Sequence, residues 1–105
     1  AETDWSQVVA LYEQLAAYDP SPMVDLNRAV ALAEVEGPRA ALDVVEALVD
    51  PRVRAHHLWH AVRADLLARL GRPDEADRAY AEAIARAANA VEADHLRARR
   101  ARLDP

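Results

Sequence analysis

Three histidines close together are the side chains that come nearest to a metal-binding pattern. His56, His57 and His60 stand in the run His-His-Leu-Trp-His, and a spacing of four would place His56 and His60 on one helix face. A tetrahedral site needs further ligands, and the chain has no cysteine and no His-Glu-x-x-His pattern to supply them. We therefore expect surface or hinge-packed histidines and no metal or other cofactor, with a metal site as the alternative.

Two arginines interrupt segments whose other residues are mostly apolar. Arg28 follows Asn27 in such a segment, and Arg63 occupies the matching place 35 residues later, near Asp65. A guanidinium in apolar surroundings must find carboxylate or carbonyl partners, because an unpaired buried charge is costly. One interpretation makes Arg28 and Arg63 structural pins. The other places Asn27, Arg28, Arg63 and Asp65 in a groove that grips a partner or a small ligand.

The two tryptophans also have two possible roles, in the core or at a docking surface. Trp5 and Trp59, with Tyr12 and Tyr80, fit core positions of predicted helices. If Trp5 or Trp59 is exposed instead, it becomes a candidate docking anchor, since exposed tryptophans are frequent interface hot spots.

Motifs of catalysis and nucleic-acid binding are missing from the sequence. There is no Gly-x-Ser-x-Gly, phosphate-binding loop, dinucleotide-binding glycine pattern or paired-carboxylate motif, so we expect no enzyme. Arg97, Arg99, Arg100 and Arg102 form a basic cluster near the C-terminus, but no aromatic residues are interleaved with it. The formal net charge of the chain is −5, so we expect no direct DNA contact from it alone.

Charge and hydropathy limit the cellular locations that fit the chain. Residues 1–50 carry ten acidic and two basic side chains, a net of −8, whereas residues 51–105 carry eight acidic and eleven basic ones, a net of +3. No apolar run approaches the ~18 residues of a membrane span, and residues at the start of the sequence do not show the basic-then-apolar pattern of a signal peptide. The absence of cysteine fits a reducing compartment, so we expect a cytoplasmic location. The start at Ala1 without methionine suggests a piece of a longer protein.

The elements that must position these residues are helices. Ala, Leu, Val and Arg dominate, and no alternating strand pattern occurs. Prolines, glycines and helix-capping residues divide residues 1–105 into one domain of about six helices. Asp4 and Ser21 are expected N-caps, and Asn89 is an expected stop. The predicted helices cover residues 4–18, 22–35, 38–49, 53–70, 73–88 and 90–103, with the first and last covering the ends and the first as the stronger cap.

The segment from Arg63 to Ile84 has the pattern of a helical hairpin. Gly71 suits the position after one helix, and Pro73 suits the first position of the next. The small–aromatic–small pattern Ala76, Tyr80, Ala83 resembles the second helix of a tetratricopeptide (TPR) repeat. A shift of 35 residues superimposes an earlier copy on this hairpin, close to the ~34-residue TPR period. The resemblance implies an all-α fold of TPR-like hairpins, in which antiparallel pairs stack as a short right-handed solenoid.

A second resemblance is more specific. Asp4-Trp5 leading to Leu11-Tyr12, the segment Pro20-Ser21-Pro22 leading to Leu26-Asn27-Arg28-Ala29-Val30-Ala31, and the run from Arg63 to Arg72 occur in this order. Together they resemble the C-terminal TPR-like extension of bacterial extracytoplasmic-function (ECF) sigma factors. The run His56-His57-Leu58-Trp59-His60 departs from the aliphatic-aromatic segment of typical members.

The second resemblance implies a function. The parent would direct RNA polymerase to promoters, with sigma regions 2 and 4 lying outside this chain. The extension would be a regulatory protein-interaction domain that modulates transcription initiation. Its partners would be the parent sigma domains, RNA polymerase or a regulatory protein, and no membrane. A small-molecule-sensing helical domain is the alternative, with its ligand near Asn27, Arg28 and Arg63.

Overall fold

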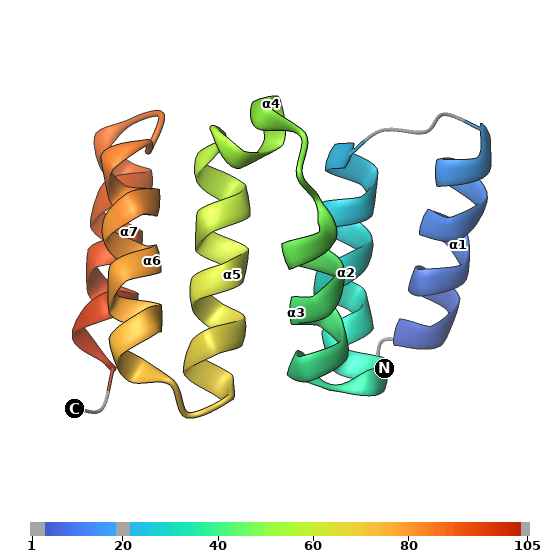
Figure 1. The fold of residues 1–105 in the computed structure, drawn as a ribbon, viewed down its shortest axis with the longest axis horizontal. Helices are drawn as coiled ribbons and strands as arrows, with labels where there is room; N and C mark the ends of the chain where they lie inside the picture. Colours follow the sequence, from blue (N-terminus) through green and yellow to red (C-terminus); the bar gives the residue numbers. More distant parts are fainter. Residues whose placement is uncertain (1–3, 19–21, 104–105) are drawn as a thin grey trace.

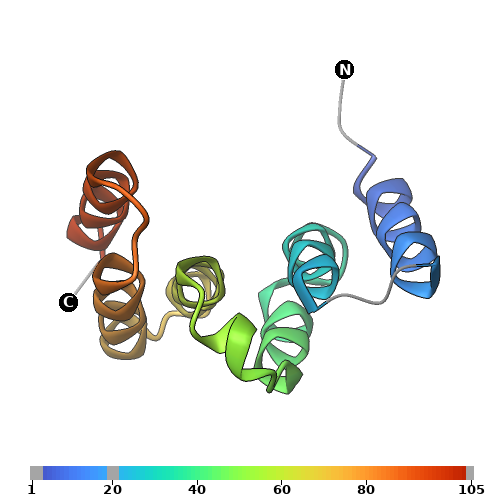
Figure 2. The ribbon, with the colours of Figure 1, turned by 90° about the horizontal axis from the view of Figure 1, so that it is seen from above.

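The computed structural model describes residues 4–18 and 22–103, and this part of the chain is all-helical, as predicted. The seven helices are α1 (Trp5–Tyr18), α2 (Pro22–Glu36), α3 (Pro38–Ala47), α4 (Pro51–Arg54), α5 (His57–Arg69), α6 (Pro73–Ala85) and α7 (Ala90–Ala101). The longer helices stand side by side in one row (Figure 1). Seen from above, the row is curved, with α2, α5 and α7 on its inner side and α3, α4 and α6 on its outer side (Figure 2).

Helices α5 and α6 are joined by a tight turn whose chemistry agrees with the prediction. Gly71 has a φ of +72°, in the left-handed region that glycine adopts at little cost. The amide of Arg72 donates to the carbonyl of Leu67 at 3.0 Å, and that of Gly71 donates to Ala68 at 3.1 Å. These two bonds form a Schellman motif, which satisfies carbonyls that the helix end would otherwise leave unpaired. Pro73 then begins α6.

Two further predicted boundaries are confirmed, and a third lies outside the described residues. Gly37, with a φ of +92°, separates α2 from α3, and Pro38 is the first residue of α3. The carboxylate of Asp4 accepts from the amide of Gln7 at 3.1 Å, which confirms Asp4 as the N-cap of α1. The predicted cap Ser21 lies outside the described residues.

The prediction of one continuous helix over residues 53–70 is wrong. Two side chains each start a helix of their own in this region. Asp50 accepts from the amide of Arg52 at 2.9 Å and begins the short α4, and Nδ1 of His56 accepts from the amide of Leu58 at 3.1 Å and begins α5. The chain therefore bends at residues 55–56, and α5 is shorter than expected.

The role predicted for Asn89 is also wrong. Helix α6 ends at Ala85, and Asn89 stands at the start of α7, where its side chain accepts from the amide of Glu92 at 2.9 Å. Asparagine favours both helix ends and N-caps, and here the N-cap role prevails.

The core follows the 35-residue shift. Ala29 and Ala64, which the shift superimposes, are both fully buried in α2 and α5. Ala41 and Ala76 are likewise fully buried in α3 and α6. Small residues at these positions let the backbones of adjacent helices approach closely. The larger core side chains around them include Leu26, Val45, Leu66, Leu67 and Tyr80.

The two helices at the ends of the row differ in the burial of their side chains. None of its described side chains is buried, and Leu11 and Leu15 are 56% and 44% exposed. Helix α7, by contrast, buries Ala93 and Leu96. Helix α1 thus packs closely on α2 but leaves large apolar side chains exposed, and the expectation that it is the stronger cap stays a prediction.

Candidate interaction groove

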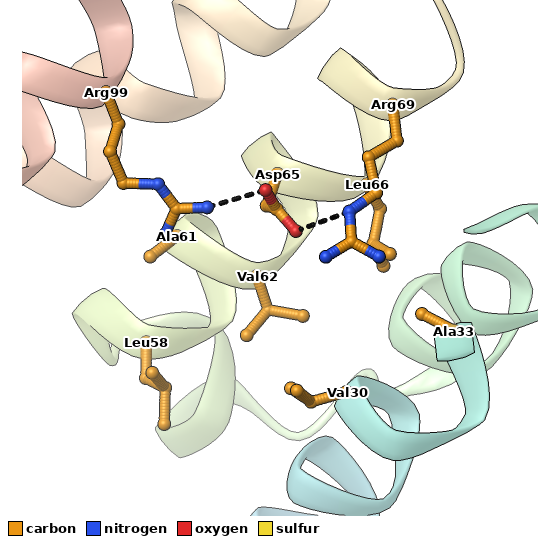
Figure 3. A pocket seen from close by; sticks show the side chains of 9 residues that line it. All are labelled: Val30, Ala33, Leu58, Ala61, Val62, Asp65, Leu66, Arg69 and Arg99. Atoms are coloured by element: carbon orange, nitrogen blue, oxygen red, sulfur yellow. Dashed lines mark hydrogen bonds and ion pairs between the residues drawn. The ribbon is translucent and has the colours of Figure 1, made fainter. Parts of the chain in front are cut away.

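The inner side of the curved row carries a pocket of about 270 Å³ between α2, α5 and α7 (Figure 3). We call this pocket and its rim the inner groove. Its lining comes from three helices that are well separated in sequence. The lining residues are Val30, Ala33, Leu58, Ala61, Val62, Asp65, Leu66, Arg69 and Arg99.

One part of the inner groove is apolar. Val30 of α2 points toward Val62 and Leu58 of α5 across the pocket (Figure 3). Val30 is 45% exposed, so this aliphatic surface is open to solvent. Covering exposed aliphatic carbon releases about 25 cal/mol per Å², which makes this floor favourable for an apolar group of a ligand or partner.

The rest of the rim is a ladder of four charged residues, which we call the rim ladder. Glu34 of α2 lies 3.2 Å from Arg69 of α5, and Arg69 also lies 3.1 Å from Asp65. The other oxygen of Asp65 accepts from Arg99 of α7 at 2.5 Å (Figure 3). Two carboxylates balance two guanidiniums, so the ladder has no formal net charge. It links the three inner helices. Because its charges are paired with one another, the exposed apolar floor is the part of the groove that is left for a partner to cover.

The structure does not bring the four predicted groove residues together. Asp65 lines the groove, and Asn27 is exposed on the face of α2 that also holds Val30, three residues on. Arg28 instead lies 4.0 Å from Glu13 of α1 and 3.9 Å from Asp25. Arg63 donates to Glu46 of α3 at 3.0 Å. The two arginines thus have the ion pairs that the structural interpretation requires, and of the four residues only Asp65 lines the groove.

Trp59 is a core residue, so its candidacy as an exposed anchor is wrong. It is 5% exposed, and its indole N–H donates to the carbonyl of Val45 in α3 at 3.0 Å. The guanidinium of Arg54 lies 4.6 Å from the centre of its ring and also donates to the carbonyls of Leu48 and Glu46 at 2.8 and 2.7 Å. Trp59 and Arg54 therefore bind the C-terminal end of α3 to the α4–α5 bend.

The other aromatic candidates differ in burial. Trp5 is 38% exposed, so it remains available as an anchor, whereas Tyr12 is half-buried. Tyr80 is 2% exposed, and this burial raises the pKa of its hydroxyl above the usual value.

The three histidines hold the α4–α5 bend in three different ways. His56 caps α5 and stacks on His57, with ring centres 4.4 Å apart, and His57 lies 3.1 Å from Glu92 of α7. Nε2 of His60 donates to the carbonyl of Arg54 at 2.6 Å, and burial lowers the pKa of His60. Because His56 lies before α5, it does not share a helix face with His60. Among the described residues, no three His, Cys, Asp or Glu side chains are grouped so as to hold a metal ion.

Most of the rim ladder was not predicted from the sequence. Glu34 and Arg69 have opposite charges and stand 35 residues apart, and Asp65 and Arg99 stand 34 apart. These spacings match the repeat period, and that match is the signal that could have found the ladder. Arg100 likewise donates to Asp77 of α6 at 2.7 and 3.1 Å, so much of the C-terminal arginine cluster serves packing between helices.

Comparison with known proteins finds one similar protein. The chain is 47% identical over 96 residues to an uncharacterized protein of Rhizobium meliloti (strain 1021). The matched part is 91% of this chain but 22% of that protein, so the chain spans about a fifth of its length. No family model matches the sequence, and no solved structure matches it. Within the described residues, no helix is long and apolar enough to cross a membrane.

Proposed function

We propose that this chain is a regulatory protein-interaction domain of an ECF RNA polymerase sigma factor. In this proposal it is a non-enzymatic, cytoplasmic module of TPR-like repeats that modulates transcription initiation. Its partners are the parent sigma domains, RNA polymerase or a regulatory protein. The parent's promoter-reading regions lie outside this chain, so the domain acts through protein contacts and not on DNA.

The arrangement of helices supports the TPR-like part of the proposal. The hairpins α2–α3 and α5–α6 each turn at a glycine with positive φ and restart at a proline. They bury alanines at superimposable positions, and α2 and α5 lie together on the inner side of the curve (Figure 2). Stacked hairpins of this kind expose an extended concave surface.

The position of the family-like segment supports the sigma-factor part. The segment that resembles the ECF extension most closely, Pro20 to Ala31, contributes the first turns of α2. Its Val30 lines the inner groove, and its Asn27 shares that face. The most specific stretch of sequence therefore lies at the candidate interaction surface.

The observation that carries the proposal is the open apolar floor of the inner groove beside a fully paired rim. Because the rim charges neutralise one another, the groove favours an apolar side chain from a partner over a charged ligand. Protein interfaces concentrate their binding energy in a few anchor side chains that fill desolvated pockets.

The test compares two exposed valines in the full-length protein that carries this domain. Val30→Glu places a charge on the groove floor, whereas Val49→Glu places the same charge at a 73% exposed site between α3 and α4. We expect Val30→Glu to change transcription from the cognate promoter by RNA polymerase several-fold, with Val49→Glu unchanged. Circular dichroism and thermal unfolding confirm that both variants fold. Equal promoter output from both variants and from a protein lacking residues 4–103 would contradict the proposal.

The pocket volume favours one second candidate, a small-molecule sensor. A cavity of about 270 Å³ lies near the lower end of ligand pockets, which are roughly 300–1,000 Å³. A binder at 100 times its dissociation constant stabilises the fold by about 2.7 kcal/mol, which a thermal-shift screen detects. A compound that stabilises the wild-type domain but not Val30→Trp, which fills the pocket, would favour this candidate.

A further inference from the structure

Helix α1 has the register of the second helix of a hairpin. Adding 68 to its residue numbers superimposes it on α6, so that Trp5 falls on Pro73 and Tyr12 on Tyr80. Adding 33 superimposes it on α3, with Trp5 on Pro38. We call α3 and α6 second helices, and α2 and α5 first helices, after their order in each hairpin.

The ion pairs of α1 and α3 agree with the 33-residue shift, because Glu13 falls on Glu46. Glu46 of the second helix α3 pairs with Arg63 of the next first helix, α5. Asp77 of the second helix α6 pairs with Arg100 of α7, from a position four residues before the one that matches Glu46. Glu13 of α1 lies 4.0 Å from Arg28 of α2. Helix α1 therefore stands before α2 as α3 stands before α5 and α6 before α7.

The outward face of α1 matches the face by which a second helix contacts its own first helix. Leu11 and Leu15 fall on Ala79 and Ala83 of α6, which are 2% and 0% exposed. Ala79 and Ala83 belong to the buried core cluster that also contains Ala64 and Leu67 of α5. In α1 the corresponding leucines are 56% and 44% exposed. We call Val8, Leu11 and Leu15 the α1 face.

Helix α7, at the opposite end of the row, has small and charged side chains on the corresponding face. Shifted by 34 residues, the buried Ala64 and Leu67 of α5 fall on Ala98 and Ala101 of α7, and Ala68 falls on Arg102. Ala98, Ala101 and Arg102 are all exposed. Small and charged side chains suit a terminal helix that faces water, as in the capping repeats of solenoids. The leucines of the α1 face do not suit a helix that faces water.

We propose that the α1 face is a docking site for one amphipathic helix of the first-helix type. The occupant is a helix antiparallel to α1, with an alanine where the helices cross and a leucine three residues later, as in Ala64 and Leu67 of α5. Residues 4–18 include two acidic side chains, Asp4 and Glu13, and no basic one, which favours basic residues at the borders of the occupant. The site continues the interface that already joins α2 to α3 and α5 to α6. More than three quarters of the Rhizobium meliloti relative lies outside the matched region, so that protein has the length to hold such a helix.

The experiment supplies this helix in the correct register. Residues 1–3 are replaced by a second copy of residues 56–71, so that the copied Gly71 directly precedes Asp4 as the original precedes Arg72. In the copy, Trp59 is changed to Ala, the residue that α7 has at the equivalent position, Ala93. We expect the extended chain to unfold at a midpoint about 5 °C or more above the original chain. Amides of α1 should become at least tenfold more protected from hydrogen exchange.

Two controls separate docking from mere extension of the chain. A copy with Ala64→Arg and Leu67→Glu has the same length but a disrupted face, and it should leave midpoint and protection unchanged. Leu11→Glu with Leu15→Glu should remove the gain from the intact copy. If the intact and disrupted copies behave alike, the proposal is wrong. It is also overturned if the original chain sediments as a dimer that Leu11→Glu dissociates, because a second copy then occupies the face.

Discussion

Glu34 and Arg69 stand 35 residues apart in the chain, and their side chains pair at 3.2 Å between α2 and α5. The internal repeat superimposes the same two positions on each other. Equivalent positions of adjacent first helices are therefore neighbours in space, and a sequence with opposite charges at such positions links one repeat to the next. Asp65 and Arg99 repeat this relationship between α5 and α7.

Removing the shared carboxylate of the rim ladder should loosen α7. Asp65 contacts both Arg69 and Arg99, so Asp65→Asn leaves two guanidiniums without their central partner. We expect a loss of about 0.5–1 kcal/mol in the free energy of unfolding, measured by urea denaturation, because the pairs are partly exposed. Asp94→Asn is the matched control, since Asp94 pairs with Arg97 within α7 and is 75% exposed. Equal losses from both variants would show that the ladder does not stabilise the packing of α7.

Trp59 should be the more stabilising of the two tryptophans. Trp59→Phe removes the bond to the carbonyl of Val45 and reduces the buried volume, which should cost about 1–3 kcal/mol of unfolding free energy. Trp5→Phe, at a 38% exposed site, should cost much less. Urea denaturation followed by far-ultraviolet circular dichroism measures both without relying on tryptophan fluorescence. A larger loss from Trp5→Phe would contradict the burial of Trp59.

Several helix boundaries were predicted correctly from one local residue each. Gly71, Pro73 and Asp4 each act through their own backbone or through a neighbouring amide, so their roles do not depend on the rest of the fold. The bend before α5 was missed because histidine is an uncommon N-cap. Nothing in the apolar periodicity of residues 53–70 shows that the ring of His56 accepts from Leu58.

The inner groove was harder to predict because it is assembled from three helices. Asn27 and Asp65 were found as polar residues in apolar segments, a signal visible within one helix. Arg28 and Arg63 gave the same signal but turn toward α1 and α3. The curvature of the row decides which neighbouring helix each face of α2 and α5 contacts. The residues of one helix alone do not predict that curvature.

The two turn glycines should differ in the substitutions that they tolerate. A Cβ atom at either residue would meet nothing within 4 Å, so any cost comes from the backbone. Gly71 has a φ of +72°, which asparagine also adopts, and Gly71→Asn should cost less than about 1 kcal/mol. Gly37, with φ +92° and ψ +167°, lies in a region used almost only by glycine.

Gly37→Asn should therefore cost about 1–3 kcal/mol of unfolding free energy. Thermal and urea unfolding of the two variants, each beside its alanine counterpart, tests this order. Asparagine should rescue part of the alanine loss at residue 71 and little of it at residue 37. A larger rescue by asparagine at residue 37 than at residue 71 would contradict the backbone conformations of the two turns.

His60 should make the fold less stable as the pH falls below about 6.5. Burial lowers the pKa of His60 in the folded protein, so below the ordinary value of 6.5 the unfolded chain binds a proton that the folded chain resists. The stability present above pH 6.5 is then lost progressively down to the folded pKa. Arg86 and Arg63 nearby also disfavour the charged ring, whereas Glu82 and the carbonyl of Arg54 favour it.

The His60→Gln variant isolates this contribution, because glutamine has an amide that can donate to the carbonyl of Arg54 but does not titrate. Urea denaturation at pH 7.5, 6.5 and 5.5 should show a smaller loss of stability for the variant than for the wild type. The other histidines are common to both proteins and cancel in the difference. The carboxylates of Asp50, Glu75 and Asp77 have lowered pKa values, because each accepts hydrogen bonds from an arginine, so they titrate only at more acidic pH. Parallel pH profiles for wild type and variant would show that His60 charges as readily in the folded protein as in the unfolded chain.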